Sequence, residues 1–426
     1  MDLYLINYLR EHAENSDVKK YIEMLKVELD WYVYNFGEHM SKSHRRNKHI
    51  SLKNRLYKSM VIYNALFGHI KNSTSNVLSS VGFPEFKSQL ADLGYNMLTS
   101  ILQPSSYKQV IGNRRIYDML KYKEWAIRHG GFNNLLNNTF FKKIDNCKKD
   151  LKELLQNYAV KGVFLYTDEY FESKLLIDVA KEIKIPTFDF LHGLPGIYSL
   201  DVDSHTDYLM VWGNKIKRNY IDAGFDAEKI IVVGNSKYGK YVKQESLRNT
   251  LSDILVIPVS SILWHQHQWG KPELIDRSMA ILYLYKVQHV LKQLNIRHAR
   301  FRVHPSINAD WVYNFLDTDF WIKDNLPLSA SLQKSSIVIG ATSSVFLEAL
   351  MNGVNYIVFE PQEEGLTLIR SRVVPPFDGK DEKLHVAFDE NDLYSMLREK
   401  YTVDSSILDD YMQPLDLSPL RKLILS

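Results

Sequence analysis

The chain has 426 residues, 45% of them hydrophobic and 24% charged, a composition typical of folded globular proteins rather than of disordered or fibrous chains. Fifty-three basic and fifty acidic residues leave a net charge of +3, which argues against nucleic acid as the main partner. The single cysteine, Cys147, excludes an intrachain disulfide, and no eighteen apolar residues run together, so we expect a cytoplasmic protein without a membrane span.

The first half of the chain begins with a helical pattern and continues with alternating β-rich and helical runs. Apolar and charged residues alternate at helical spacing over about 1–70, which predicts a helical prelude, and 116–158 predicts one long helical stretch. Strands are expected at 77–81, 94–102, 162–166, 186–191, 207–212 and 229–234. The last four of these form two βαβ units, because helical segments separate them in pairs.

A second series of such runs follows the polar stretch 234–249. Strands are expected at 253–261, 300–304, 337–341 and 355–361, with a long helix at 273–294 and a shorter one through 347–353. This alternation predicts parallel sheets with crossover helices. We therefore expect an α/β protein of two doubly wound, Rossmann-like domains, residues 1–245 and 246–426, with a ligand bound in the cleft between them.

Several polar residues in the second domain follow predicted strands, where open α/β sheets bind ligands. They are Ser260, Ser261, Arg302, His304, Pro305, Thr342, Ser343 and Ser344. Basic side chains, hydroxyls and the N–H groups at a helix start all favour anions, so these residues are predicted to bind the phosphates of a nucleotide-activated donor. Glu348, one helical turn beyond Ser344, could reach the ribose or base, or could have only a structural role.

In the first domain, three residues that could exchange protons follow predicted strands at the same sheet edge. Asp168, Glu169 or His192 could take the proton of an acceptor hydroxyl during sugar transfer. The alternatives are structural: the two acids could cap the helix that begins near Phe171, and His192 could bond only to backbone in its Gly-Leu-Pro-Gly turn.

Other patterns carry weaker predictions. The segment 43–55 gathers Lys, Arg and His without a carboxylate, so it could contact anionic lipid headgroups or be a solvated helix end. Two Asp-x-Asp triplets, at 201–203 and 317–319, do not close an obvious central strand, and we predict no metal site. Glycine-rich dinucleotide and Walker motifs are absent, and no cofactor is expected beyond the nucleotide-sugar substrate.

These motifs resemble those of bacterial surface-polysaccharide glycosyltransferases. The stretch from LHGLPG through VWG to VVGNS resembles that group, and RFRVHPSI and ATSSVFLEAL resemble the HP and serine motifs of sialyltransferases, polysialyltransferases and Kdo transferases. The resemblance covers about 160–365 and extends to the CDP-glycerol polymerases and UDP-N-acetylglucosamine 2-epimerases. It implies a GT-B fold, a metal-independent reaction, and contact of His304, Ser343 and Ser344 with the donor phosphate. The acid-acid-glycine motif of such sialyltransferases has its only counterpart in the second domain, at Glu363-Glu364-Gly365.

The predicted function is therefore transfer of a sugar to a growing capsule or lipopolysaccharide glycan, from a CMP-sugar in the first instance and a UDP-sugar in the second. The acceptor would be a glycan or glycolipid, reached by peripheral contact with the inner membrane face. Two alternatives stay open: a sugar-nucleotide epimerase on the same scaffold, and a non-catalytic scaffold of polysaccharide assembly.

Overall fold

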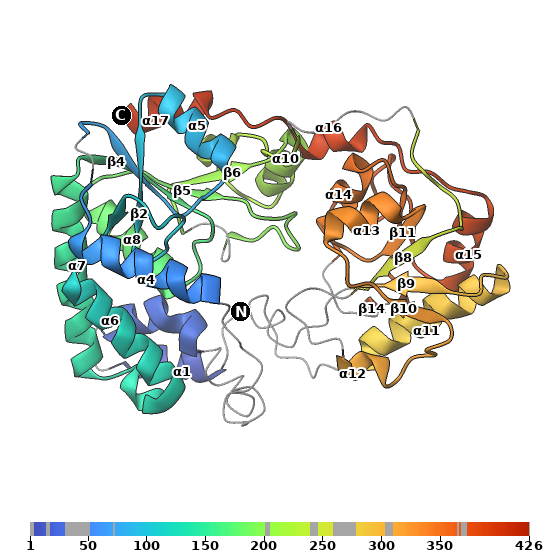
Figure 1. Ribbon diagram of the computed structural model, residues 1–426, viewed down its shortest axis with the longest axis horizontal. Helices are drawn as coiled ribbons and strands as arrows, with labels where there is room; N and C mark the ends of the chain where they lie inside the picture. The colour runs from blue at the N-terminus through green and yellow to red at the C-terminus, as the bar shows by residue number, and fades with distance from the viewer. Residues whose placement is uncertain are drawn as a thin grey trace.

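The protein consists of two lobes, each built around one parallel sheet, which lie side by side (Figure 1). The computed structural model describes residues 4–13, 18–29, 52–70, 73–200, 205–238, 246–258, 278–302, 310–363, 366–367 and 373–425. Within these ranges, no helix is both long and apolar enough to cross a bilayer.

The sheet of the first lobe has seven parallel strands in the order β3-β2-β1-β4-β5-β6-β7. The strands are β1 (Asn76–Ser79), β2 (Asn96–Ser100), β3 (Val110–Ile111), β4 (Val160–Leu165), β5 (Thr187–Phe190), β6 (Tyr208–Val211) and β7 (Ile230–Val232). Three strands, β1, β3 and β5, are buried along their whole length, and most residues of β2, β4 and β6 are buried, as expected for a sheet covered on both faces. Alternate residues face opposite sides, so Leu78 and Val163 pack with one core cluster while Val77 and Phe164 pack with another.

The sheet of the second lobe repeats this order with six parallel strands, β10-β9-β8-β11-β12-β15. They are β8 (Ile254–Ile257), β9 (Ala299–Phe301), β10 (Trp321–Lys323), β11 (Ile337–Gly340), β12 (Tyr356–Phe359) and β15 (Val386–Ala387), and an antiparallel pair joins β13 (Gln362–Glu363) to β14 (Leu366–Thr367). Gly340 is required for the packing, since a Cβ there would lie 2.1 Å from the Tyr356 hydroxyl. Two sheets of this order confirm the predicted architecture of two Rossmann-like domains, the GT-B arrangement.

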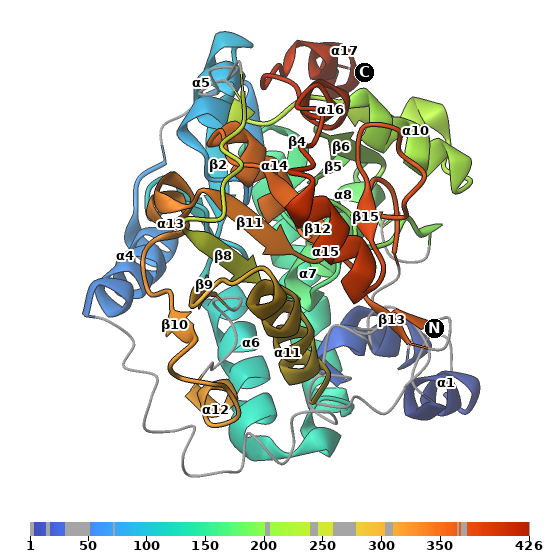
Figure 2. The same ribbon diagram turned by 90° about the vertical axis from the view of Figure 1, so that its right-hand side faces the viewer.

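Helices cover the faces of both sheets. They are α1 (Tyr4–Glu11), α4 (Leu52–Phe67), α5 (Pro84–Asp92), α6 (Arg114–Trp125), α7 (Asn138–Asn157), α8 (Phe171–Glu182), α10 (Asn214–Asp222), α11 (Ser278–Gln293), α12 (Asp310–Tyr313), α13 (Leu328–Lys334), α14 (Val345–Met351), α15 (Glu390–Arg398), α16 (Ile407–Tyr411) and α17 (Arg421–Leu425). In the second lobe, α11 and α15 pack on one face of the sheet and α13 and α14 on the other (Figure 2).

The single long helical stretch predicted for 116–158 is wrong. The chain leaves the helix after Trp125, passes through a π turn at 126–130, and adopts φ +79° at Gly131, a conformation that interrupts a helix. A new helix then begins at Asn138, where the Asn137 side chain accepts a hydrogen bond of 2.8 Å from the backbone N–H of Phe140. The short strands β3, β10 and β15 were not predicted, because two or three residues carry no readable alternation.

Two chain segments connect the lobes and run beside each other. The N–H of Asn235 donates to the Gln413 carbonyl at 2.8 Å, and the N–H of Gln413 donates to the Trp212 carbonyl at 2.9 Å. Gly234 has φ +74° and a Cβ there would lie 2.1 Å from the Pro414 oxygen, so this close approach requires glycine. After the second crossing, α17 packs on the first lobe (Figure 1), with Ile424 in its core.

Candidate functional site

Each sheet has one position where the strand order reverses, between β1 and β4 in the first lobe and between β8 and β11 in the second. Ligands of open α/β sheets bind in the crevice at the carboxyl ends of such strands. The segment that follows β4 contains Asp168 and Glu169, and the segment that follows β11 is Thr342-Ser343-Ser344. The sequence-predicted loops therefore lie at the edge of each sheet where a ligand is expected.

The loops of the two lobes meet directly. The backbone N–H of Leu194, in the turn that begins with His192, donates a hydrogen bond of 2.9 Å to the Ser344 hydroxyl. A Cβ added at Gly193 would lie 3.0 Å from the same oxygen, which is tighter than ordinary contacts. The structure thus brings the turn that begins with His192 into contact with Ser344, which the sequence places in the other domain.

His192 lies in an aromatic setting at the edge of the first sheet. Its ring centroid is 5.8 Å from that of Tyr166, and Tyr166 lies 5.6 Å from the ring of Phe83. Although His192 is exposed by area, the surrounding protein desolvates the imidazole and lowers its pKa, an effect that the charge of Asp168 opposes. A lowered pKa favours the neutral imidazole, which is the form that can accept a proton.

Asp168 is buried and bound to His205, a residue that the sequence analysis missed. One carboxylate oxygen accepts from the His205 backbone N–H at 3.2 Å and lies 3.1 Å from its ring Nδ1. The predicted capping role of the acids is not what the structure shows, because α8 receives its cap from Glu28, whose Oε1 accepts from the Phe171 N–H at 3.1 Å. Burial, followed by the charge of Asp168, raises the pKa of Glu169.

In the second lobe, Thr342 and Glu348 are engaged in protein contacts. Thr342 donates from both its N–H and its hydroxyl to one oxygen of Glu360, a carboxylate that is completely buried. Glu348 forms an ion pair of 2.7 Å with Lys237 in the first crossing segment. Glu360 was also missed; the only sequence signal for it is an acid that ends an apolar run.

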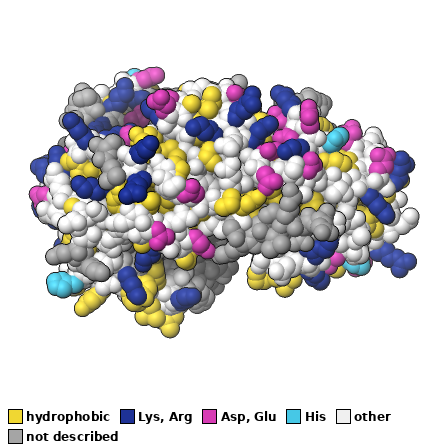
Figure 3. Space-filling model, turned by 90° about the horizontal axis from the view of Figure 1, so that it is seen from above, with side chains coloured by type: hydrophobic (Ala, Val, Ile, Leu, Met, Phe, Trp, Pro, Cys, Tyr) yellow, Lys and Arg dark blue, Asp and Glu magenta, His cyan; other side chains and the backbone are white. Residues whose placement is uncertain are grey.

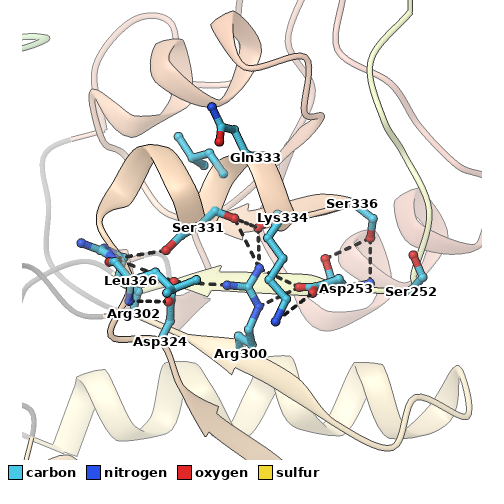
Figure 4. Close-up of polar contacts among 12 residues, drawn as sticks. Ser252, Asp253, Arg300, Arg302, Asp324, Leu326, Ser331, Gln333, Lys334 and Ser336 are labelled. Carbon is cyan, nitrogen blue, oxygen red and sulfur yellow. Dashed lines mark hydrogen bonds and ion pairs between the residues drawn. The ribbon is translucent and has the colours of Figure 1, made fainter.

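Arg302 belongs to a polar network at the end of β9 (Figure 4). Its guanidinium donates to the Leu326 carbonyl and, at 3.3 Å, to the Ser331 hydroxyl, and lies 3.8 Å from Asp324. The neighbouring Arg300 pairs with Asp253 at 2.6 Å. These contacts hold Arg302 within its own lobe, so a role in donor binding stays a prediction.

Four predicted residues, Ser260, Ser261, His304 and Pro305, lie outside the described residues. The strands that precede them, β8 and β9, are present and end at Ile257 and Phe301. Among the residues that the structure does describe, no group of three His, Cys, Asp or Glu side chains is placed to hold a metal ion.

Comparisons with known proteins identify no family. No family model matches the chain, and no curated protein matches it. Among solved structures, the UDP-GlcNAc 2-epimerase of Neisseria meningitidis bound to UDP-GlcNAc is similar at 14% identity and a TM-score of 0.42, over 82% of this chain and 98% of that one. A variant of the wall teichoic acid polymerase TagF is similar at 14% identity and 0.41, over 91% and 97%. The MurG of Acinetobacter baumannii is similar at 11% identity and 0.42, over 82% and 99%. Likeness at this distance identifies no substrate.

Proposed function

We propose that the chain is a glycosyltransferase that moves a sugar from a nucleotide-activated donor, a CMP-sugar or else a UDP-sugar, to a glycan acceptor. The observation that carries the proposal is the hydrogen bond between the Leu194 N–H and the Ser344 hydroxyl. This bond joins the turn that begins with His192, in one Rossmann-like lobe, to the hydroxyl loop of the other, at the edge where such sheets bind ligands, and so supports the proposal.

In the proposed reaction, an acceptor hydroxyl oxygen attacks the anomeric carbon of the donor sugar. The new bond forms as the bond from that carbon to the phosphate oxygen breaks, and the nucleotide leaves with the bonding electrons. His192 takes the proton of the acceptor hydroxyl, since burial lowers the pKa of its imidazole and keeps it unprotonated. Asp168 and Glu169 are the other candidates for this base, but Asp168 is held by His205.

The second lobe would stabilise the departing nucleotide. Ser343 and Ser344 present hydroxyl groups at the end of β11, and hydrogen-bond donors placed where negative charge develops lower the barrier of such reactions. Arg302, His304, Ser260 and Ser261 follow neighbouring strands of the same sheet and complete the proposed donor-binding set. Closure of the two lobes would exclude water, which would otherwise hydrolyse the donor.

The first experiment is a thermal-shift screen with CMP, CDP, UDP and GDP. A ligand that binds only the folded protein raises its melting temperature, and we expect the cytidine nucleotides to give the largest shift. The bound donor is then incubated with and without acceptor. Conversion of the donor alone would favour the epimerase, and failure of every nucleotide to bind would favour a non-catalytic scaffold.

A matched pair of variants tests the base. His192→Gln should lower the rate of sugar transfer by about 100-fold or more, the range expected for loss of a general base, without a comparable change in nucleotide affinity. His289→Gln is the control, since His289 is exposed on α11 in the second lobe. Equal rates in the two variants would remove His192 from the mechanism.

The proposed cellular role is assembly of a capsule or lipopolysaccharide glycan by a cytoplasmic enzyme at the inner membrane face. The acceptor at such a surface would be a glycan or glycolipid, and the basic segment 43–55 would contact anionic headgroups. Detection of the protein in the membrane fraction of lysed cells at low salt, and its release at high salt, is the expected result.

A further inference from the structure

One helix of the first lobe presents an apolar face that the described structure leaves uncovered. Five large side chains of α4 are exposed, by 74% at Leu52, 56% at Leu56, 43% at Met60, 63% at Tyr63 and 74% at Phe67. Their spacing of four, four, three and four residues places them within an arc of about 80° on an α-helix. The rings of Tyr63 and Phe67 lie 5.7 Å apart along this arc.

The opposite side of α4 holds the helix on the lobe. Val61 and Ala65 are buried there, and the Tyr57 hydroxyl lies 3.5 Å from the Pro104 carbonyl, to which it donates. Gly112 beside β3 lets the helix approach, because a Cβ at that position would come within 3.2 Å of Ala65. The exposed arc, called the α4 stripe below, is therefore a fixed feature of the folded lobe.

Positive charge flanks the N-terminal part of the α4 stripe. Lys53 and Arg55 are exposed and fall on either side of the arc at about 100° per residue. Eight Lys and Arg residues, and no Asp or Glu, lie between Glu38 and Glu85 in the sequence. In the view from above, hydrophobic side chains adjoin Lys and Arg side chains along the lower rim of the first lobe (Figure 3). The helix itself crosses the front of that lobe in Figure 1 and lies at its edge in Figure 2.

We propose that the α4 stripe docks the protein on an anionic lipid surface, with its apolar side chains among the acyl chains and Lys53 and Arg55 at the headgroups. An apolar helix face flanked by basic residues has this chemistry, since both burial and charge favour the interface. Long basic side chains can extend their charged ends toward phosphates while their stems remain apolar.

A second copy of the chain is the less favourable occupant. A helix of this length offers a face of roughly 24 Å by 10 Å, which is about a third of the roughly 800 Å² that each partner buries in a stable interface. Pairing two α4 stripes would also bring their basic flanks together, and like charges repel.

Sedimentation with lipid vesicles tests the proposal on the full-length protein. Phosphatidylcholine vesicles containing phosphatidylglycerol should carry the protein down at low salt, whereas pure phosphatidylcholine vesicles should not. Neutralising both basic residues, as Lys53→Gln with Arg55→Gln, should weaken binding about 25-fold, since each basic residue contributes about fivefold near an anionic surface.

Met60→Glu tests the apolar part and should weaken vesicle binding by about tenfold or more, since it puts a negative charge among the acyl chains. Ile221→Glu on α10 is the matched control, because Ile221 is 37% exposed and lies outside the stripe. Equal effects of the two variants, or no vesicle binding by the unmodified protein, would overturn the proposal. A dimer in solution that Met60→Glu dissociates would overturn it in favour of a second copy.

The proposal rests on the proposed function in one respect, since it extends the headgroup contact of the segment 43–55, which contains Lys53 and Arg55. Vesicle binding requires neither donor nor turnover, and the Met60→Glu protein should keep the nucleotide-induced thermal shift of the unmodified chain. Loss of vesicle binding and loss of nucleotide binding are therefore separate results.

Discussion

The contact between the lobes predicts how a methyl group at position 193 changes stability. The new Cβ of Gly193→Ala would lie 3.0 Å from the Ser344 hydroxyl oxygen, so this oxygen must move by a few tenths of an ångström. Such a shift weakens its hydrogen bond from the Leu194 N–H, and a hydrogen bond of this kind contributes about 1 kcal/mol to stability. For a domain of this size, about 1 kcal/mol corresponds to a melting temperature lower by about 2–4 °C.

A double-mutant cycle measures this effect without assuming any activity. Ser344→Ala removes the hydrogen bond and also the oxygen that the new methyl group would meet, so Gly193→Ala should cost almost nothing in the Ser344→Ala background. Gly162→Ala is the control for the loss of chain entropy in the unfolded state, because a Cβ there meets only ordinary contacts of 3.5 Å or more. Additive losses in the cycle, with no coupling between positions 193 and 344, would refute the close approach of the two loops.

Three further predictions concern single residues. Thr342→Val removes a hydroxyl donor from the buried Glu360 carboxylate. Hydrogen bonds to charged groups contribute about 2 kcal/mol, so this variant should melt about 4–8 °C lower than Thr342→Ser, which keeps the hydroxyl. Because burial lowers the pKa of His192, transfer activity should fall only below pH 6.5. Asp168→Asn removes the charge that raises this pKa, so it should move the fall in activity to still lower pH. An unchanged pH profile in that variant would contradict the assignment of His192 as the base. Burial raises the pKa of Asp178, but hydrogen bonds and charges of two lysines outweigh burial and lower the pKa from 3.8. Asp178→Asn should therefore lower the free energy of unfolding above pH 3.8. This difference in stability should vanish as the pH falls through the folded-state pKa of Asp178.

The arrangement of the two sheets could be predicted because it depends on long, regular patterns. Buried strands such as β8 and β11 are continuous apolar runs in the sequence, and helical segments separate such runs, which predicts parallel sheets. The break between α6 and α7 was not predicted, although the adjacent Gly130 and Gly131 are a turn signal that the sequence contains, and Gly131 adopts the positive φ that interrupts the helix. Sequence periodicity therefore identifies the elements that fill the core better than the points where the chain changes direction.

The candidate site could be predicted only as far as strand ends locate it. Sequence order places Ser344 and His192 at strand ends, and the structure brings their loops together. Sequence order does not show which polar side chains are already engaged in protein contacts. In the structure, Thr342 is bound to Glu360, and Arg302 is bound to Ser331. Such partners are distant in sequence, so the residue types alone could not separate a ligand-binding group from a structural one.

Glu28, in the helix formed by 18–29, helps to hold one end of the segment that carries the proposed acids. The helix formed by 18–29 places this carboxylate, 95 residues or more from its partners, where it accepts from the Phe171 N–H at 3.1 Å and from Lys123 at 3.2 Å. Tyr170, the residue before α8, offers no side-chain cap of its own, so the first turn of that helix depends on Glu28 for its free N–H. The segment 166–170 between β4 and α8 carries the proposed acids, and its end is therefore fixed by a helix from the start of the chain. The helical prelude is thus a structural part of the first lobe, because without it α8 would begin with an unsatisfied donor beside the candidate site.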